Sequence, residues 1–268
     1  MLIKKLVSKY EELGFSVANC RNLAAEEIII SKIAKSPLAD HVTLKGGIIM
    51  YNLTKSSRRV TQDIDFDLIH YSIDEESIKL FFKKLNSLKD GVSMSIKGKI
   101  EKLHQEDYRG VRVNLAIKDI EGTQLEAKLD IGVHTHNLIE QQKIVFCFDN
   151  DENSISINAN SYEQLFAEKL LSLGRFGPFS TRYKDIYDLY YLVANNHVNA
   201  EKVSYILNVL LSSSNREPND LNKLVNVILN TFDNSDFAKD ADKPISKWIN
   251  VDYQTAVSTI KPFILKLL

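Results

Sequence analysis

Hydrophobic residues recur along the first half of the chain with two different periods, and each period predicts one kind of element. Spacings of three and four residues predict helices within the first 36 residues, ended by Pro37, and again from 73 to 88. Alternating or short apolar stretches predict strands at about 41–44, 60–68, 92–103, 108–118, 124–133, 143–148 and 154–158. With turns expected near Glu106-Asp107 and Glu121-Gly122, the longer strands are typical of antiparallel pairs.

The pattern changes at Ser161, where Ser161-Tyr-Glu-Gln164 has the spacing of a helix capping box. Helices are then predicted at about 161–174, 181–196, 200–213, 217–232 and 252–267. Strands followed by helices predict an α+β fold, a mixed β-sheet flanked by helices and then a helical C-terminal lobe. We therefore expect two domains, 1–160 and 161–268, with a ligand cleft between them.

The composition is that of an ordinary globular protein, with 44% hydrophobic and 26% charged residues among 268. A net charge of −1 argues against a protein that coats nucleic acid non-specifically, although 34 Lys and Arg can still form a local basic patch. Cys20 and Cys147 lie far apart without metal-ligand spacing, so both are expected to be reduced thiols. No signal peptide and no run of 18 apolar residues occurs, so we expect a cytoplasmic protein without a membrane span.

Candidate chemistry begins in the alternating segment 60–68, which divides its side chains between two strand faces. Three apolar residues share one face and three carboxylates the other: Ile64, Phe66 and Leu68 against Asp63, Asp65 and Asp67. Mg²⁺ prefers hard oxygen ligands and is commonly held by one or two carboxylates plus substrate phosphates. Asp63 and Asp65 are therefore candidate Mg²⁺ ligands, although a solvated strand face with acids by chance has the same pattern.

Two neighbouring features favour the metal interpretation. Lys45-Gly46-Gly47 lies between a predicted strand and a predicted helix, where glycines let the backbone approach a phosphate and free N–H groups bind it. The segment 125–131 alternates as well and places Asp130 deep in an apolar run, where a carboxylate needs a partner such as a metal. Asp130 is thus the third candidate ligand, ahead of Glu126.

Taken in order, these motifs resemble the AbiEii/AbiGii toxin family, which includes the MenT-type toxins and belongs to the polymerase-β-like nucleotidyltransferase superfamily. The resemblance covers more than half of the chain, and the order and spacing of individually weak motifs carry it. It runs through Lys45-Gly-Gly47, Arg58-Arg-Val-Thr-Gln-Asp-Ile-Asp-Phe-Asp67, Leu129-Asp130, Glu168-Lys169 and Arg182-Tyr-Lys-Asp-Ile-Tyr-Asp-Leu189.

The resemblance implies a nucleotidyltransferase-like fold and nucleotide transfer from an NTP with Mg²⁺. In MenT-type relatives the acceptor is the 3′ end of tRNA, and other relatives are nucleotide-binding toxins of type IV pairs, which implies a cognate antitoxin as partner. Site residues carry over by position: Asp63 and Asp65 for metal, Thr61 at the family's Ser/Thr position, Lys169 for the triphosphate, and Asp185 to complete the site. The nucleotide-binding set is then Lys45, Gly46, Gly47, Thr61 and Lys169.

Two positions qualify this picture. Ile48 stands where the family usually has Ser or Thr after the glycines, and Ile cannot offer a hydroxyl to a phosphate, although the backbone N–H groups remain. Lys169 also has a purely structural interpretation, because it lies at the edge of an apolar stripe where a lysine can extend its charge beside the core.

Three functional hypotheses follow from these residues. The first is an enzyme that transfers a nucleotide to RNA, with tRNA as the favoured acceptor. The second is an enzyme that transfers a nucleotide to a protein or a small molecule, and the sequence hardly separates the two because their first step is the same. The third is a non-catalytic nucleotide-binding module that acts through a partner, and Ile48 gives it some weight.

Overall fold

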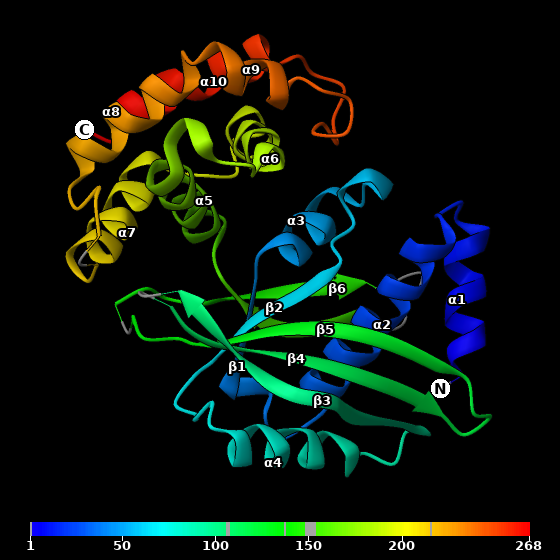
Figure 1. Ribbon diagram of the computed structural model, residues 1–268. Helices are drawn as coiled ribbons and strands as arrows, with labels where there is room; N and C mark the ends of the chain where they lie inside the picture. Colours follow the sequence, from blue (N-terminus) through cyan, green and yellow to red (C-terminus); the bar gives the residue numbers. More distant parts are fainter. Residues whose placement is uncertain (1, 106–107, 137, 148–153, 215) are drawn as a thin grey trace. The chain divides into compact units, whose positions relative to one another are not determined.

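The computed structural model describes residues 2–105, 108–136, 138–147, 154–214 and 216–268, and it confirms a mixed α/β architecture (Figure 1). Its strands are β1 (Val42–Lys45), β2 (Asp63–Leu68), β3 (Val92–Gln105), β4 (Tyr108–Asp119), β5 (Gln124–Val133), β6 (Gln142–Cys147) and β7 (Ser154–Ala159). Its helices are α1 (Ile3–Glu12), α2 (Val17–Ala34), α3 (Gly47–Thr54), α4 (Glu75–Asn86), α5 (Tyr162–Phe176), α6 (Tyr183–Ala194), α7 (Ala200–Ser212), α8 (Leu221–Phe232), α9 (Ser235–Ala241) and α10 (Tyr253–Leu265).

The chain folds into two compact units. The first, which we call the sheet unit, comprises Met1–Thr135 and Gln141–Ala159 and holds every described strand. The second, the helical unit, comprises His136–Glu140 and Asn160–Leu268 and holds α5 to α10. None of the helices in the described ranges is long and apolar enough to cross a membrane.

The sheet unit is built on seven strands in the order β3-β4-β5-β2-β1-β7-β6. Two pairs are parallel, β2 with β5 and β1 with β7, and the other neighbours are antiparallel, so the sheet is mixed as the sequence predicts. The predicted alternation along β2 is confirmed, because Ile64, Phe66 and Leu68 are all buried. Leu129 and Ile131 on β5 are fully buried beside them in register, which makes one sheet face apolar.

Two helices cover this apolar face. Asp74 caps α4 by accepting the Ser77 N–H at 2.8 Å, and Phe81 of α4 stacks on Phe66 of β2 at 5.9 Å between ring centroids. On α2, the buried Lys32 donates to Asp90 just beyond the end of α4 at 2.7 Å. Helix α2 packs against β5 and α4 against β3, and Lys32 joins α2 to the segment that follows α4.

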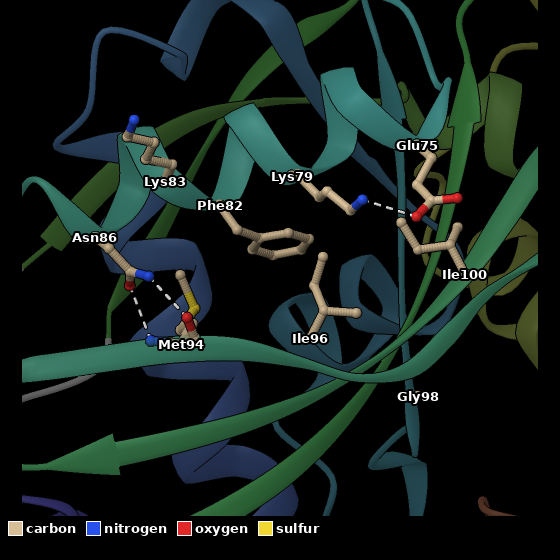
Figure 2. Close-up of a pocket in the computed structure, with 9 residues that line it drawn as sticks. All are labelled: Glu75, Lys79, Phe82, Lys83, Asn86, Met94, Ile96, Gly98 and Ile100. Carbon is tan, nitrogen blue, oxygen red and sulfur yellow. Dashed lines mark hydrogen bonds and ion pairs between the residues drawn. The ribbon is translucent and has the colours of Figure 1, made fainter.

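A shallow pocket of about 420 Å³ lies between α4 and β3 (Figure 2). Its floor holds Phe82, and its rim carries the Glu75–Lys79 ion pair at 2.8 Å. Asn86 joins helix to strand, because its side chain exchanges two hydrogen bonds with the backbone of Met94 at 2.7 and 2.8 Å. None of the site residues predicted from the sequence lines this pocket.

The helical unit is organised around α5 and α6. Ser161 caps α5 by accepting the Gln164 N–H at 3.1 Å, which confirms the predicted helix start. Tyr187 of α6 is fully buried, and its hydroxyl donates to the Ala241 carbonyl at 2.8 Å. This tyrosine is thus part of the core, as its position on an apolar helix face predicts.

Differences from the sequence prediction are confined to element ends and one short helix. The strand predicted from residue 60 begins at Asp63, because Ser57–Arg59 form a 3-10 turn before it. The helix predicted from residue 217 begins at Leu221, where Asp220 caps it. Helix α9 was not predicted, because its seven residues are mostly polar and show little periodicity. The turn expected at Glu106-Asp107 lies outside the described residues.

One carboxyl in the sheet unit is buried without a partner. Glu26 on α2 is 3% exposed, and its Oε1 has no hydrogen-bond partner among the described residues. Its neighbour Glu27 is also buried, yet it accepts from the Tyr10 hydroxyl at 2.8 Å and pairs with Lys9 at 3.2 Å. Because burial disfavours the charged form, it raises the pKa of Glu26 well above the usual 4.5.

This buried acid gives a first prediction, on stability against pH. From about pH 4.5 upward the folded protein holds a proton on Glu26 that the unfolded chain has released, so the free energy of unfolding falls as pH rises. One proton corresponds to about 1.4 kcal/mol per pH unit until the folded-state pKa is passed. The nearby Tyr10 and Tyr51 have their pKa raised, mainly by burial, and do not ionise in this window.

The measurement is urea unfolding of the wild-type protein and Glu26→Gln between about pH 5 and pH 8. Gln has the shape of Glu and does not titrate, so the difference in the free energy of unfolding between the two proteins should change steadily with pH. Stability curves that stay parallel over this range would contradict a raised pKa at Glu26.

Candidate functional site

Two of the three predicted metal ligands, Asp65 and Asp130, lie in one line across the middle of the sheet, and Asp63 lies two residues before Asp65 on β2. Strand β2 runs between β1 and β5, and Asp65 is the register partner of Lys45 on one side and of Asp130 on the other. Asp130 is in turn the register partner of Arg112 on β4. Because register partners project from the same sheet face, these four side chains form a line of charges, + − − +, which we call the charged row.

The charged row is held by ion pairs that the sequence prediction missed. Arg112 donates Nε and Nη2 to the two oxygens of Asp130, at 2.8 and 2.7 Å, and this pairing raises the pKa of Arg112. Lys128, the register partner of Asp63, approaches it at 2.6 Å. Both cations lie on alternating strand segments, so their face could be read from the sequence, but their partners depend on strand order.

The Lys45-Gly-Gly turn lies directly against the charged row. Gly46 has φ +70° and ψ −145°, and a Cβ there would come within 3.0 Å of Asp65 Oδ2. A Cβ on Gly47 would lie 2.9 Å from Thr61 Oγ1 and 3.1 Å from Arg59 Nη1. Two glycines are therefore required because Asp65 and Thr61 pack onto the backbone at the start of α3.

Thr61 and Lys45 complete the surroundings of the turn. The Thr61 hydroxyl donates to the Asp63 carbonyl at 3.1 Å, which fixes the entry into β2. Lys45 pairs with Asp67 at 2.9 Å, and Asp67 is buried. Asp67, which is not among the predicted metal ligands, thus pairs with a cation of the charged row. The buried Arg59 is a further residue that the sequence did not single out, although it precedes the acidic pair in the resemblance motif.

Ile48 points away from the turn. Its side chain is 1% exposed and lines a second cavity of the sheet unit, together with Leu23 of α2 and Tyr51 of α3. At the position where the family motif usually has a hydroxyl, this chain therefore has an apolar side chain that lines the cavity. Backbone N–H groups are what the start of α3 offers to an anion.

Lys169 and Asp185 meet in the helical unit. Lys169 of α5 forms ion pairs with Asp185 and, at 2.7 Å, with Asp188, both on α6. Asp188 is fully buried, and Lys169 and Asp185 are nearly so. Asp188, three residues after Asp185, is thus the member of this cluster to which the sequence gave no firm role.

The structure therefore brings the predicted residues together in two groups. The sheet unit joins Lys45, Gly46, Gly47, Thr61, Asp63, Asp65 and Asp130, and the helical unit joins Lys169 with Asp185. That the two groups form one site stays a prediction. Glu126, the weaker candidate, is exposed and pairs with Lys97.

The donor atoms of the charged row suit a divalent cation in kind. Carboxylate oxygens are the hard ligands that Mg²⁺ prefers, and Asp65 and Asp130 are adjacent across the sheet. Within the described part of the chain, no three His, Cys, Asp or Glu side chains are gathered as a ready metal cluster. One or two carboxylates completed by substrate phosphates are therefore the arrangement that these residues fit.

The close approach of Gly46 to Asp65 gives a second prediction. Gly46→Ala adds a Cβ at positive φ and against Asp65 Oδ2, and it should lower the free energy of unfolding by about 1–3 kcal/mol. Gly98→Ala is the matched control, because Gly98 has φ +69° but no atom within 4 Å of its added Cβ. We expect Gly46→Ala to be the more destabilising of the two.

A double-mutant cycle isolates the contact in urea unfolding. In the Asp65→Ala background the carboxyl is gone, so the destabilisation by Gly46→Ala should shrink. Equal destabilisation in both backgrounds would show that Asp65 does not constrain the turn.

Comparison with protein-family models identifies the family of the chain. A protein-family model described as the nucleotidyl transferase AbiEii toxin of type IV toxin–antitoxin systems matches residues 28–263, most of the 268-residue chain. The matched range includes both groups of site residues. No curated protein sequence matches the chain at a significant level.

Proposed function

The chain belongs to the AbiEii family of nucleotidyltransferase toxins from type IV toxin–antitoxin systems, and on this premise we propose that it transfers a nucleotide from an NTP to RNA. The proposed acceptor is the 3′ end of tRNA, and the proposed place of action is the cytoplasm, where NTP and tRNA are both available. The observation that carries the proposal is the contact between the Gly46-Gly47 turn and Asp65 in the charged row. It joins a phosphate-binding backbone to carboxylates suited to Mg²⁺.

We propose Asp63, Asp65 and Asp130 as the carboxylates that would hold Mg²⁺, with one or two of them bound to the ion at a time and substrate phosphates as its other ligands. When bound, Mg²⁺ would neutralise phosphate oxygens and make the acceptor hydroxyl more acidic. In its absence Arg112 and Lys128 neutralise Asp130 and Asp63, which keeps like charges on adjacent strands compatible with folding. Binding of the cation therefore requires Arg112 and Lys128 to release the carboxylate oxygens that they contact. Both basic side chains are long and partly exposed.

The start of α3 is the proposed triphosphate site. The N–H groups of the first helical turn have no partner within the helix and carry the positive end of the helix dipole. Gly46 and Gly47 add no side chains of their own beside these N–H groups, and Arg59 places a guanidinium beside Gly47. These donors can bind a triphosphate although Ile48 offers no hydroxyl.

Lys169 is proposed as a further contact to the triphosphate. It holds one positive charge between the carboxylates of Asp185 and Asp188, so its position is fixed before substrate arrives. A preorganised cation loses little conformational freedom when it meets a phosphate, which favours rate as well as binding. The cognate antitoxin that the family implies is the proposed protein partner.

Transfer itself gives a third prediction. Purified protein is incubated with each labelled NTP, Mg²⁺ and total tRNA, and the label on tRNA is measured after gel separation. Asp65→Asn should reduce labelling on the order of 10²–10³-fold, because it removes a carboxylate that would hold the Mg²⁺ that neutralises charge on the phosphate oxygens. Glu126→Gln is the matched control, since Glu126 is exposed on β5 outside the charged row and should leave labelling unchanged.

The other hypotheses are outcomes of the same assay. Label on protein or on a small molecule that is lost in Asp65→Asn would show that the protein transfers nucleotides but that its acceptor is not RNA. Nucleotide binding with no transfer to any acceptor would leave a non-catalytic module and refute the proposed activity.

Lys169 gives a fourth prediction, which separates a direct contact with the triphosphate from a purely structural role. Lys169→Met removes the cation that pairs with the buried Asp185 and Asp188, so it should lower stability by about 3–5 kcal/mol and abolish transfer. Asp188→Asn also disturbs the buried cluster but keeps the lysine, so it should lose stability and retain transfer at temperatures where it is folded. Equal loss of transfer in both folded variants would assign Lys169 a structural role only.

A further inference from the structure

The sheet unit contains a second cavity that the proposed transfer reaction does not use. It has a volume of about 400 Å³, within the range of small-molecule sites. Its walls come from α1, α2, α3 and β6, and none of its lining residues belongs to the charged row. Because all of these elements belong to the sheet unit, the cavity is complete within one compact part of the chain.

The inner wall of this cavity carries the unpaired Glu26. The carboxyl is 3% exposed, lines the cavity, and has no hydrogen-bond partner for Oε1 among the described residues. A buried polar group without a partner is destabilising, so an occupant that supplies partners would be favoured. Burial raises the pKa of Glu26, and a protonated carboxyl offers one O–H donor and one carbonyl acceptor side by side.

Aromatic rings form the sides of the cavity. Phe15 meets Tyr10 and Tyr51 edge-on, with ring centroids 5.9 and 6.4 Å apart. Flat apolar walls of this kind favour a planar ring as occupant, because it buries large area with little loss of conformational freedom. Ile48 and Leu23 extend the apolar wall.

A lysine lies at the exposed part of the cavity. Lys55, the residue that ends α3, contributes to the lining and is exposed. Its Nζ donates to the Asn52 side chain at 2.8 Å and lies 5.8 Å from the Tyr51 ring centre, and no carboxylate pairs with it among the described residues. An anionic group on the occupant can therefore bind Lys55 without breaking an ion pair between described residues.

We propose that this cavity binds a nucleoside monophosphate whose base carries an amino group beside a ring nitrogen, as adenine and cytosine do. The Glu26 O–H donates to the ring nitrogen and its carbonyl accepts from the amino group, while the phosphate binds Lys55. This pairing survives a change of charge, because a carboxylate with a protonated base makes the same two hydrogen bonds. The site is separate from the charged row and does not rest on the proposed transfer activity.

Calorimetric titration of the full chain with AMP tests the proposal, in buffer with EDTA so that no metal joins the nucleotide to the charged row. Binding is compared with that of purine riboside 5′-monophosphate, which lacks the amino group, and of ribose 5-phosphate, which lacks the base. We expect AMP to bind roughly tenfold or more tightly than the first, because its amino group satisfies the Glu26 carbonyl. Ribose 5-phosphate should not bind measurably.

Variants locate the site. Glu26→Leu should abolish AMP binding, whereas Glu26→Gln should retain part of it, because an amide keeps one donor and one acceptor. Lys55→Gln should weaken AMP but leave adenosine, which has no phosphate, unchanged. Asp65→Asn should bind AMP as the wild type does, which separates this cavity from the charged row.

Three results would overturn the proposal: no AMP binding, equal binding of AMP and the compound without the amino group, or loss of binding in Asp65→Asn but not in Lys55→Gln. The first two are measured on the wild-type protein, so they decide the question even if Glu26→Leu does not fold. Failure of the transfer assay with AMP binding intact would refute the proposed function and leave this inference standing.

Discussion

The position of β2 between β1 and β5 is the constraint on which the rest of the candidate site depends. Side chains alternate along a strand, so a slip of one residue would turn Asp63 and Asp65 into the core and bring Ile64 to the solvent. The fully buried Phe66, stacked on α4, makes that slip costly. The core on one face of the sheet therefore fixes the chemistry on the other.

The same register decides how the charges coexist. Asp65 and Asp130 are adjacent, and without compensation two carboxylates at cross-strand distance destabilise the sheet. Lys45 and Arg112 stand at the two ends of the line, and Lys128 meets Asp63 one step away. The protein can thus fold with its carboxylates neutralised by its own cations. The proposed metal would compete with those cations for the carboxylates, and a triphosphate would compete with the carboxylates for the cations. Affinity for the metal would then be lowered by the two hydrogen bonds between Arg112 and Asp130, which together are stronger than a single contact.

The order of helices and strands could be predicted from the sequence, and so could the strand face on which each carboxylate lies. Both depend on the local spacing of apolar residues. Spacing alone places Asp63 and Asp65 on one face of their strand and Asp130 on one face of its own, and the pairing of β2 with β5 brings these faces together. Partners that depend on strand order could not be predicted in this way. Arg112 becomes a partner of Asp130 only once β4 is known to lie beside β5.

Burial inside helices was equally hidden from the sequence. Glu26 lies in a helix whose buried positions extend around most of its circumference, so a rule that places charged residues on the solvent side fails there. Ile48 looked like a weakened phosphate contact when only the motif was compared. The structure shows that its position is shaped by packing, since its side chain belongs to the wall of an apolar cavity.

Helix α3 contributes both to the surroundings of the charged row and to the second cavity. The Gly46-Gly47 turn at its start approaches Asp65 and Thr61, and its residues Ile48 and Tyr51 line the cavity that contains Glu26. A hydroxyl at position 48 would face the cavity, where it would need a partner, whereas Ile needs none. The departure from the family pattern is therefore consistent with a turn that binds phosphate through its backbone and a helix whose side chains serve the cavity behind it.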